Sequence, residues 1–96
     1  MFVGDALNAA REAYARQTWA SARSGFARAA AGKALTLDDI ERWAIAVHLT
    51  GNEAECRDVL ARGHREALER KDVTRAVRFA FWIGHLMMCT GEWAQA

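Results

Sequence analysis

Apolar residues recur along this chain every three to four positions, the spacing of one face of an α-helix. No segment alternates apolar and polar residues with the period of two that a half-buried strand needs. Proline is absent and good helix formers are abundant. The pattern predicts an all-α fold of five helices plus the start of a sixth. Their expected spans are 6–16, 19–31, 37–49, 53–70 and 73–89, with the sixth beginning at 92–93.

The residues between the apolar segments predict where the helices begin and end. Asp5, Thr18 and Asp72 are expected to be N-caps, because their side-chain oxygens can accept hydrogen bonds from first-turn amides. Thr36 and Asn52 each stand three residues before an acidic residue, which is the spacing of a capping box. Glycine tolerates the left-handed conformation that ends many helices. The expected helix-ending glycines are Gly32, Gly51 and Gly91.

One helix-turn-helix pattern occurs three times, at 16–22, 50–56 and 90–96. Gln17 and Gly51 are 34 positions apart, and Gly51 and Gly91 are 40 apart. Small residues stand at matching places before and after each turn, where two helices could cross closely. They are Ala10, Ala44 and Gly84 before the turns, and Ala22, Cys56 and Ala96 after them. An ordinary helical bundle would explain the apolar periodicity but not this repetition.

The pattern resembles the tetratricopeptide repeat family over essentially the whole chain, although the proline that often closes such repeats is missing. The resemblance implies one domain, 1–96, built as an α-solenoid of antiparallel helical hairpins. Its repeats are expected at 4–35, 36–71 and 72–96, the last incomplete. It also implies a non-enzymatic module that binds a protein or peptide.

Two segments, 19–26 and 62–84, are similar to the region ahead of the DNA-binding domain in actinobacterial LuxR-type transcription regulators. In that family a helix-turn-helix domain lies far downstream of the repeats. It is not found in these 96 residues, so we expect no nucleic-acid contact by this chain. The resemblance also makes the chain's own downstream domains a candidate partner.

In tetratricopeptide arrays the first helix of each repeat lines a concave face that binds peptides. Carried over by position, the candidate groove residues are Leu7, Arg11, Tyr14, Asp38, Glu41, Ile45, His48, Arg78, Phe81, His85 and Met88. Some members clamp a peptide's terminal carboxylates with Lys and Asn at these places, and both are absent here. The mixed surface therefore favours an amphipathic partner helix. The open alternative is that these side chains face solvent or a neighbouring helix.

The fifth expected helix has almost no polar face over 79–89, and a helix apolar all round needs cover all round. One explanation is that the chain is the N-terminal piece of a longer solenoid, which its end in mid-helix favours. The other is a homodimer whose second copy supplies the cover. The candidate self-association residues are Phe79, Trp82, Leu86 and Trp93.

Charge and cysteine usage narrow the function classes. Thirteen basic and twelve acidic side chains give a net charge of +1, which indicates neither a nucleic-acid nor an anionic-membrane surface. No apolar run reaches the roughly 18 residues of a membrane span, and the N-terminus lacks the pattern of a secretory signal. Cys56 and Cys89 are expected to be reduced thiols of a cytoplasmic protein.

The sequence offers little for catalysis or metal binding. His85 and Cys89 share a helix face, but a structural zinc site needs four ligands. A third ligand from His48, Cys56 or His64 is not indicated by spacing. As a nucleophile and base, the His85–Cys89 pair lacks an orienting third group. We therefore expect no catalytic residue, no metal and no cofactor.

Overall fold

The structure, a computed structural model, describes the backbone of residues 3–32 and 35–90 and the side chains of 6–32 and 35–86. The described residues form five α-helices and no strand, so the all-α prediction is confirmed. The helices are α1 (Val3–Ala15), α2 (Trp19–Gly32), α3 (Leu37–Leu49), α4 (Glu53–Glu69) and α5 (Val73–Thr90). The expected sixth helix and the third turn lie outside the described residues.

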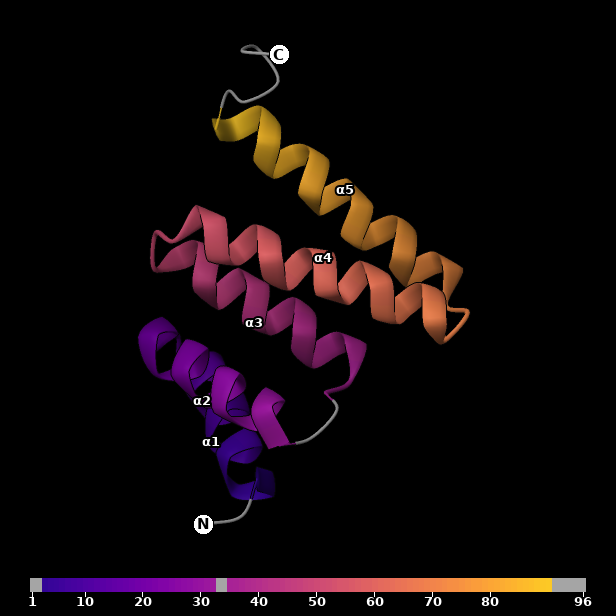
Figure 1. The fold of residues 1–96 in the computed structure, drawn as a ribbon. Helices are drawn as coiled ribbons and strands as arrows, with labels where there is room; N and C mark the ends of the chain where they lie inside the picture. Colours follow the sequence, from indigo (N-terminus) through magenta and orange to yellow (C-terminus); the bar gives the residue numbers. More distant parts are fainter. Residues whose placement is uncertain (1–2, 33–34, 91–96) are drawn as a thin grey trace.

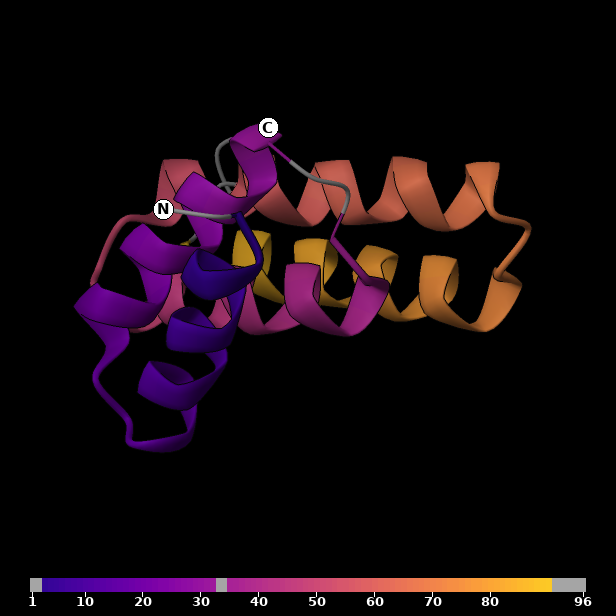
Figure 2. The ribbon, with the colours of Figure 1, turned by 90° about the horizontal axis from the view of Figure 1, so that it is seen from below.

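The helices are stacked in chain order from the N-terminal to the C-terminal end of the molecule (Figure 1). Each helix packs against the next one in the chain, and α1 also contacts α3. Seen from below, α3 and α5 share one layer while α4 lies in the other (Figure 2). The result is an elongated body of about 45 × 30 × 20 Å.

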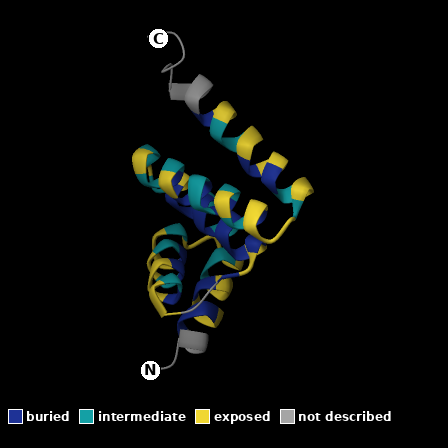
Figure 3. Cartoon of the chain, turned by 45° about the vertical axis from the view of Figure 1, so that its right-hand side comes forward, coloured by how far each residue is buried: buried dark blue, intermediate teal, exposed yellow. Residues whose placement is uncertain are grey.

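The core runs along the stack as one cluster of buried apolar side chains (Figure 3). Its largest apolar members that are almost fully enclosed are Phe26, Phe79, Leu35, Ile40 and Val47. Burying each of these large apolar side chains contributes about 1.5–3 kcal/mol to stability.

Small residues allow the close helix crossings, largely where the sequence places them. Ala10, Ala22, Ala44 and Cys56 are buried, and the Cys56 thiol donates a hydrogen bond to the Ala44 carbonyl at 3.3 Å. Gly84 is exposed, with open space where a Cβ would lie. The four small residues at close crossings therefore belong to the first four helices, whereas the matching position on α5 has no described neighbour within 4 Å.

Three of the expected caps are confirmed. Thr36 Oγ1 accepts a hydrogen bond from Asp39 N at 3.1 Å, and Asn52 Oδ1 accepts one from Glu55 N at 3.0 Å. Asp72 Oδ1 accepts from the backbone N of Arg75, also at 3.1 Å. Each bond satisfies a first-turn amide that has no partner inside its helix.

Two other expected boundaries are wrong, and the hydroxyl of one expected cap, Thr18, bonds to the preceding helix. The first helix begins at Val3, so Asp5 lies inside it rather than capping it. Gly32 is the last residue of α2 and not a residue beyond its end. Thr18 precedes α2, but its hydroxyl donates to the Ala13 carbonyl at 2.9 Å. The tight turn places that hydroxyl beside the open carbonyls of α1, so it closes the preceding helix.

The three hairpin turns of the described chain share one backbone geometry. Each contains a residue with positive φ: Gln17 at 63°, Gly51 at 87° and Lys71 at 58°. In each turn the next residue's amide bonds back to a carbonyl five residues earlier, as in the Schellman motif. Sequence analysis placed a turn between the fourth and fifth expected helices, but not the left-handed conformation of Lys71, because lysine gives no signal for it.

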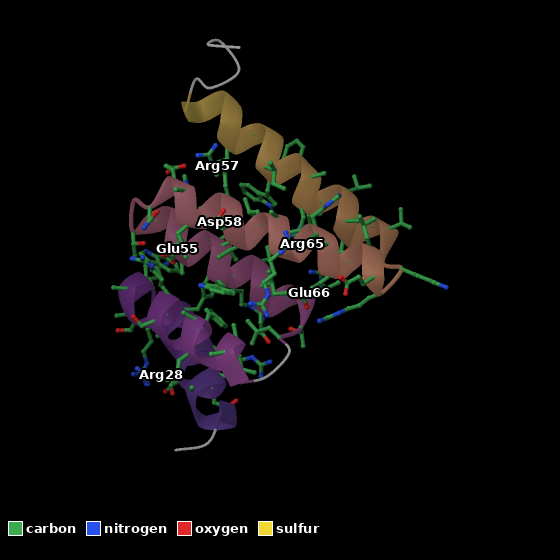
Figure 4. The ribbon with its side chains drawn as sticks, viewed as in Figure 1. Arg28, Glu55, Arg57, Asp58, Arg65 and Glu66 are labelled. Carbon is green, nitrogen blue, oxygen red and sulfur yellow. The ribbon has the colours of Figure 1, made fainter. Side chains whose placement is uncertain are left out.

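Ion pairs join helices that are next but one in the chain. Arg11 of α1 pairs with Asp39 of α3, and Arg23 of α2 pairs with Glu55 of α4, which is labelled in Figure 4. On α5, Arg75 pairs with Asp38 of α3. These contacts span 28 to 37 positions of sequence. They fix the stacking of the layers beyond the packing of consecutive helices.

Candidate functional site

An apolar cleft of about 170 Å³ lies among α3, α4 and α5. Its lining is mainly apolar, with Glu41, His48 and His85 as its polar members. It is lined by Glu41, Ala44, Ile45, His48, Leu49, Cys56, Leu60, Trp82, His85 and Leu86. Four of the residues that sequence analysis placed in a groove therefore meet here: Glu41, Ile45, His48 and His85.

A second, more polar hollow of about 200 Å³ adjoins the cleft. It is lined by Tyr14 of α1, by Asp38, Glu41, Arg42 and Ile45 of α3, and by Arg78 of α5. Glu41 and Ile45 belong to both depressions. One continuous surface along α3 is thus bounded by α1 on one side and α5 on the other. We call this surface, the cleft plus the hollow, the α3 groove.

Four predicted groove residues lie elsewhere or cannot be placed. Leu7 is buried in the core, and the guanidinium of Arg11 is paired with Asp39 and lines neither depression. Phe81 is 66% exposed and stacks on His85, with ring centroids 6.2 Å apart. Met88 lies outside the described side chains.

The three described self-association residues are buried or half-buried rather than exposed. Phe79 and Leu86 are buried, and Trp82 is half-buried at the cleft. The Phe79 ring packs on Gly63 of α4. Trp93 lies outside the described residues. Among the described side chains of α5, the large apolar ones that are exposed are instead Val73, Val77 and Phe81, at 70%, 63% and 66%. Sequence analysis could not identify the exposed face, because a helix that is apolar on every side gives no sign of which face packs against α4.

A nearly buried carboxylate separates the two depressions. The Glu41 side chain is 9% exposed and accepts a hydrogen bond from Arg78 Nε at 2.8 Å, while Arg75 Nη1 lies 3.5 Å away. Sequence analysis missed these pairs. A signal was present, because acids three apart at 38 and 41 match arginines three apart at 75 and 78.

His48 and the Cys56 thiol each have a partner in the described part of the chain, Glu53 and the Ala44 carbonyl respectively. His48 Nδ1 lies 3.2 Å from Glu53 Oε1, at the rim of the cleft. Burial, with smaller effects from the charges of Glu53 and Glu55, raises the pKa of the Cys56 thiol to about 11. This thiol is therefore a poor nucleophile near neutral pH. The Cys89 side chain is not described, so the His85–Cys89 pair stays untested.

Neither a metal site nor a membrane span is found in the part of the chain that the structure describes. No three His, Cys, Asp or Glu side chains of this part gather closely enough to hold a metal ion. None of its helices combines the length and apolarity needed to cross a bilayer.

Comparison of the chain with family models, curated proteins and solved structures found no match.

Proposed function

We propose that the chain is a non-enzymatic helical-repeat module that binds a protein partner in the α3 groove. The observation that carries this proposal is the adjoining cleft and hollow, in which side chains of α1, α3, α4 and α5 meet. Binding sites on proteins are typically concave, mostly apolar and edged by a few polar groups. The cleft has this composition.

Three features support a stack of repeated helical hairpins. The turns at Gln17 and Gly51 have the same geometry 34 positions apart, and small residues pack at the crossing of Ala44 with Cys56. Ion pairs join next-but-one helices all along the stack. These features agree with the tetratricopeptide resemblance. On this proposal the chain acts in the cytoplasm, and its partner is another protein or a further domain of a LuxR-type regulator.

The size of the cleft favours a protein partner over a cofactor. Sites for small organic ligands usually enclose about 300–1,000 Å³. A volume of about 170 Å³ suits one large apolar side chain inserted from a partner. Protein interfaces commonly concentrate their binding energy in such an anchored side chain.

Selection from a random peptide library displayed on phage, with the purified chain as bait, tests the proposal. We expect enriched peptides whose binding weakens at least tenfold in Ile45→Asp. Leu68→Asp is the matched control, because Leu68 is 54% exposed on α4 and lines neither depression. Circular dichroism establishes that both variants are folded. The proposal is contradicted if no peptide is enriched, or if peptide binding weakens equally in Ile45→Asp and Leu68→Asp.

Self-association is a second candidate function, favoured by the exposed stripe of Val73, Val77 and Phe81 on α5. These residues are four apart and so share one helix face. Analytical ultracentrifugation of the wild type and of Val77→Glu decides it. A dimer that Val77→Glu dissociates and Leu68→Glu leaves intact supports this function. A monomer at high micromolar concentration excludes it.

A further inference from the structure

The α3 groove has two chemically different ends, and the following inference rests on the proposed function. The cleft end is apolar, with Ile45, Leu49 and Trp82 accessible in its wall. The hollow end presents Arg42 and Arg78 beside Tyr14. A partner that fills the groove must match both ends.

The exposed charges of the hollow end are mainly cationic. The side chains of Arg42 and Arg78 are 41% and 56% exposed, whereas those of Asp39 and Glu41 are 0% and 9% exposed. Asp38 is more exposed, at 53%, but it is paired with Arg75. The buried carboxylates therefore hold the arginines in place, while the guanidinium groups remain accessible to an approaching molecule.

Both guanidinium groups retain donors. Arg42 uses Nη1 for Asp39 Oδ1 at 3.1 Å, and Arg78 uses Nε for Glu41 Oε2 at 2.8 Å. A guanidinium carries five N–H donors, and these bonds use one from each group. The printed ion pairs form two clusters: Arg11 and Arg42 share Asp39, and Arg75 and Arg78 pair with Asp38 and Glu41. The first cluster has one more cation than carboxylates, and the second is balanced. The surplus cation of the first cluster favours an anionic group in the hollow.

The spacing of the two ends of the groove sets the distance between the acidic and the apolar side chain of a matching partner. Arg78 and Trp82 are four apart on α5, and Arg42 and Ile45 are three apart on α3. One helical turn separates such residues by about 5–6 Å along the axis. A carboxylate and an apolar side chain have this separation when they are three or four residues apart on a helix, or about two apart on an extended chain.

We propose that the partner of the α3 groove is an acidic peptide segment. It inserts a large apolar side chain between Ile45 and Trp82, and it places an Asp or Glu about one helical turn away against Arg42 and Arg78. The occupant is thus a protein segment of defined charge. A second copy of this chain and a basic segment are the competing occupants.

The library selection described above separates this inference from the proposed function. We expect enriched peptides to carry Asp or Glu within four residues of Leu, Met, Phe or Trp. Enrichment of basic or uncharged peptides would overturn the inference and leave the interaction function intact. Enrichment of none would overturn both.

A synthetic copy of the most enriched peptide then measures the charge contribution by fluorescence anisotropy. We expect Arg42→Gln/Arg78→Gln to weaken binding at least tenfold and to reduce its dependence on NaCl concentration. Arg28→Gln is the matched control, because Arg28 lies on α2 and lines neither depression (Figure 4). Replacing the peptide's acidic residues by Gln or Asn should weaken wild-type binding and leave the double variant unaffected.

Two results would contradict this assignment. One is an unchanged affinity in the double variant once circular dichroism shows that it is folded. The other is a wild-type dimer whose dissociation by Arg42→Gln/Arg78→Gln reveals a second copy as the occupant of the groove. Should the double variant fail to fold, the singly substituted Arg78→Gln and the peptide's Gln and Asn variants provide the same comparison.

Discussion

Arg11 and Asp39 join α1 to α3 through two parallel hydrogen bonds, from Nε to Oδ1 at 2.9 Å and from Nη2 to Oδ2 at 2.6 Å. The Asp39 side chain is fully buried, while that of Arg11 is 43% exposed. Burial alone would raise the pKa of Asp39. Hydrogen bonds from Arg11 and Thr36, with the charges of Arg11 and Arg42, outweigh burial and hold this pKa below its ordinary value.

This ion pair should make the free energy of unfolding depend on pH in the acidic range. Because the pKa of Asp39 is lower in the folded than in the unfolded chain, the pair stabilises the fold above the unfolded pKa of about 4. That stabilisation is lost as the pH falls through the folded-state pKa. We expect Asp39→Asn to lower the free energy of unfolding by about 2 kcal/mol at pH 7. This is less than the roughly 3–5 kcal/mol lost when one partner of a fully buried ion pair is removed, because the partly exposed Arg11 can turn toward water. Urea unfolding between pH 7 and pH 2 measures both effects.

Glu55 provides an internal comparison for the acid dependence. A hydrogen bond from Arg23 lowers its pKa, so part of the acid sensitivity should survive in Asp39→Asn. The variant should nevertheless lose less stability than the wild type between pH 5 and pH 2. An identical acid profile in the two proteins is incompatible with the assigned role of Asp39.

Two helical glycines should respond to alanine in opposite directions. A Cβ on Gly63 would lie 2.5 to 2.8 Å from ring carbons of Phe79, whereas a Cβ on Gly84 would meet open space. Overpacking costs about 1–3 kcal/mol, and replacing a helical glycine by alanine gains up to about 1 kcal/mol. We expect Gly63→Ala to destabilise the fold and Gly84→Ala to stabilise it, as measured by urea unfolding. Adding Phe79→Leu should cost less in Gly63→Ala than in the wild type, and equal costs would argue against the contact.

The left-handed turn residues give a third prediction. Lys71 has a φ of 58°, which is unfavourable for a residue with a Cβ, and Gly51 has a φ of 87°. We expect Lys71→Gly to stabilise the protein by about 0.5–1 kcal/mol and Gly51→Ala to destabilise it by about 1 kcal/mol. Thermal unfolding followed by circular dichroism tests both. Lys71→Ala, which keeps the Cβ, controls for the lost charge and should change stability little.

The Cys56 thiol should be unreactive in the folded protein. With a pKa of about 11, about one thiol in a thousand is ionised at pH 8, and the side chain is buried. We expect iodoacetamide at pH 8 to modify Cys56 slowly in buffer and rapidly in urea. Peptide mass spectrometry assigns the modified cysteine separately from Cys89. Rapid native labelling of Cys56 would show that the α3–α4 crossing opens readily.

Local chemistry accounts for the parts of this fold that sequence analysis predicted correctly. The bounds of α3 match the expected span, because Thr36 supplies the cap at its start and Gly51 the left-handed residue after its end. Thr18 was misassigned since its hydroxyl has two possible partners, an amide of α2 or a carbonyl of α1. Only the path of the turn decides between them.

The candidate site was predicted in part for a similar reason. Helical spacing alone places Glu41, Ile45 and His48 on one face of α3, and the cleft includes all three. The same spacing could not show that Arg11 is held by Asp39, because the two residues are 28 positions apart and meet only in the stack. Nor could it show that the Arg78 guanidinium, 37 positions from Glu41, completes the wall of the hollow.

The sequence by itself determined the helices and most of their ends, since periodicity, caps and glycines act within a few residues. Tertiary structure alone decided which face of α5 is covered. Phe79 and Phe81 are chemically alike and two positions apart, yet one is 1% exposed and the other 66%. Phe79 packs on Gly63 of α4, where a Cβ would clash with its ring, whereas Phe81 lies on a face that is exposed. Burial of such a residue depends on the shape of its neighbour, which a single helix does not encode.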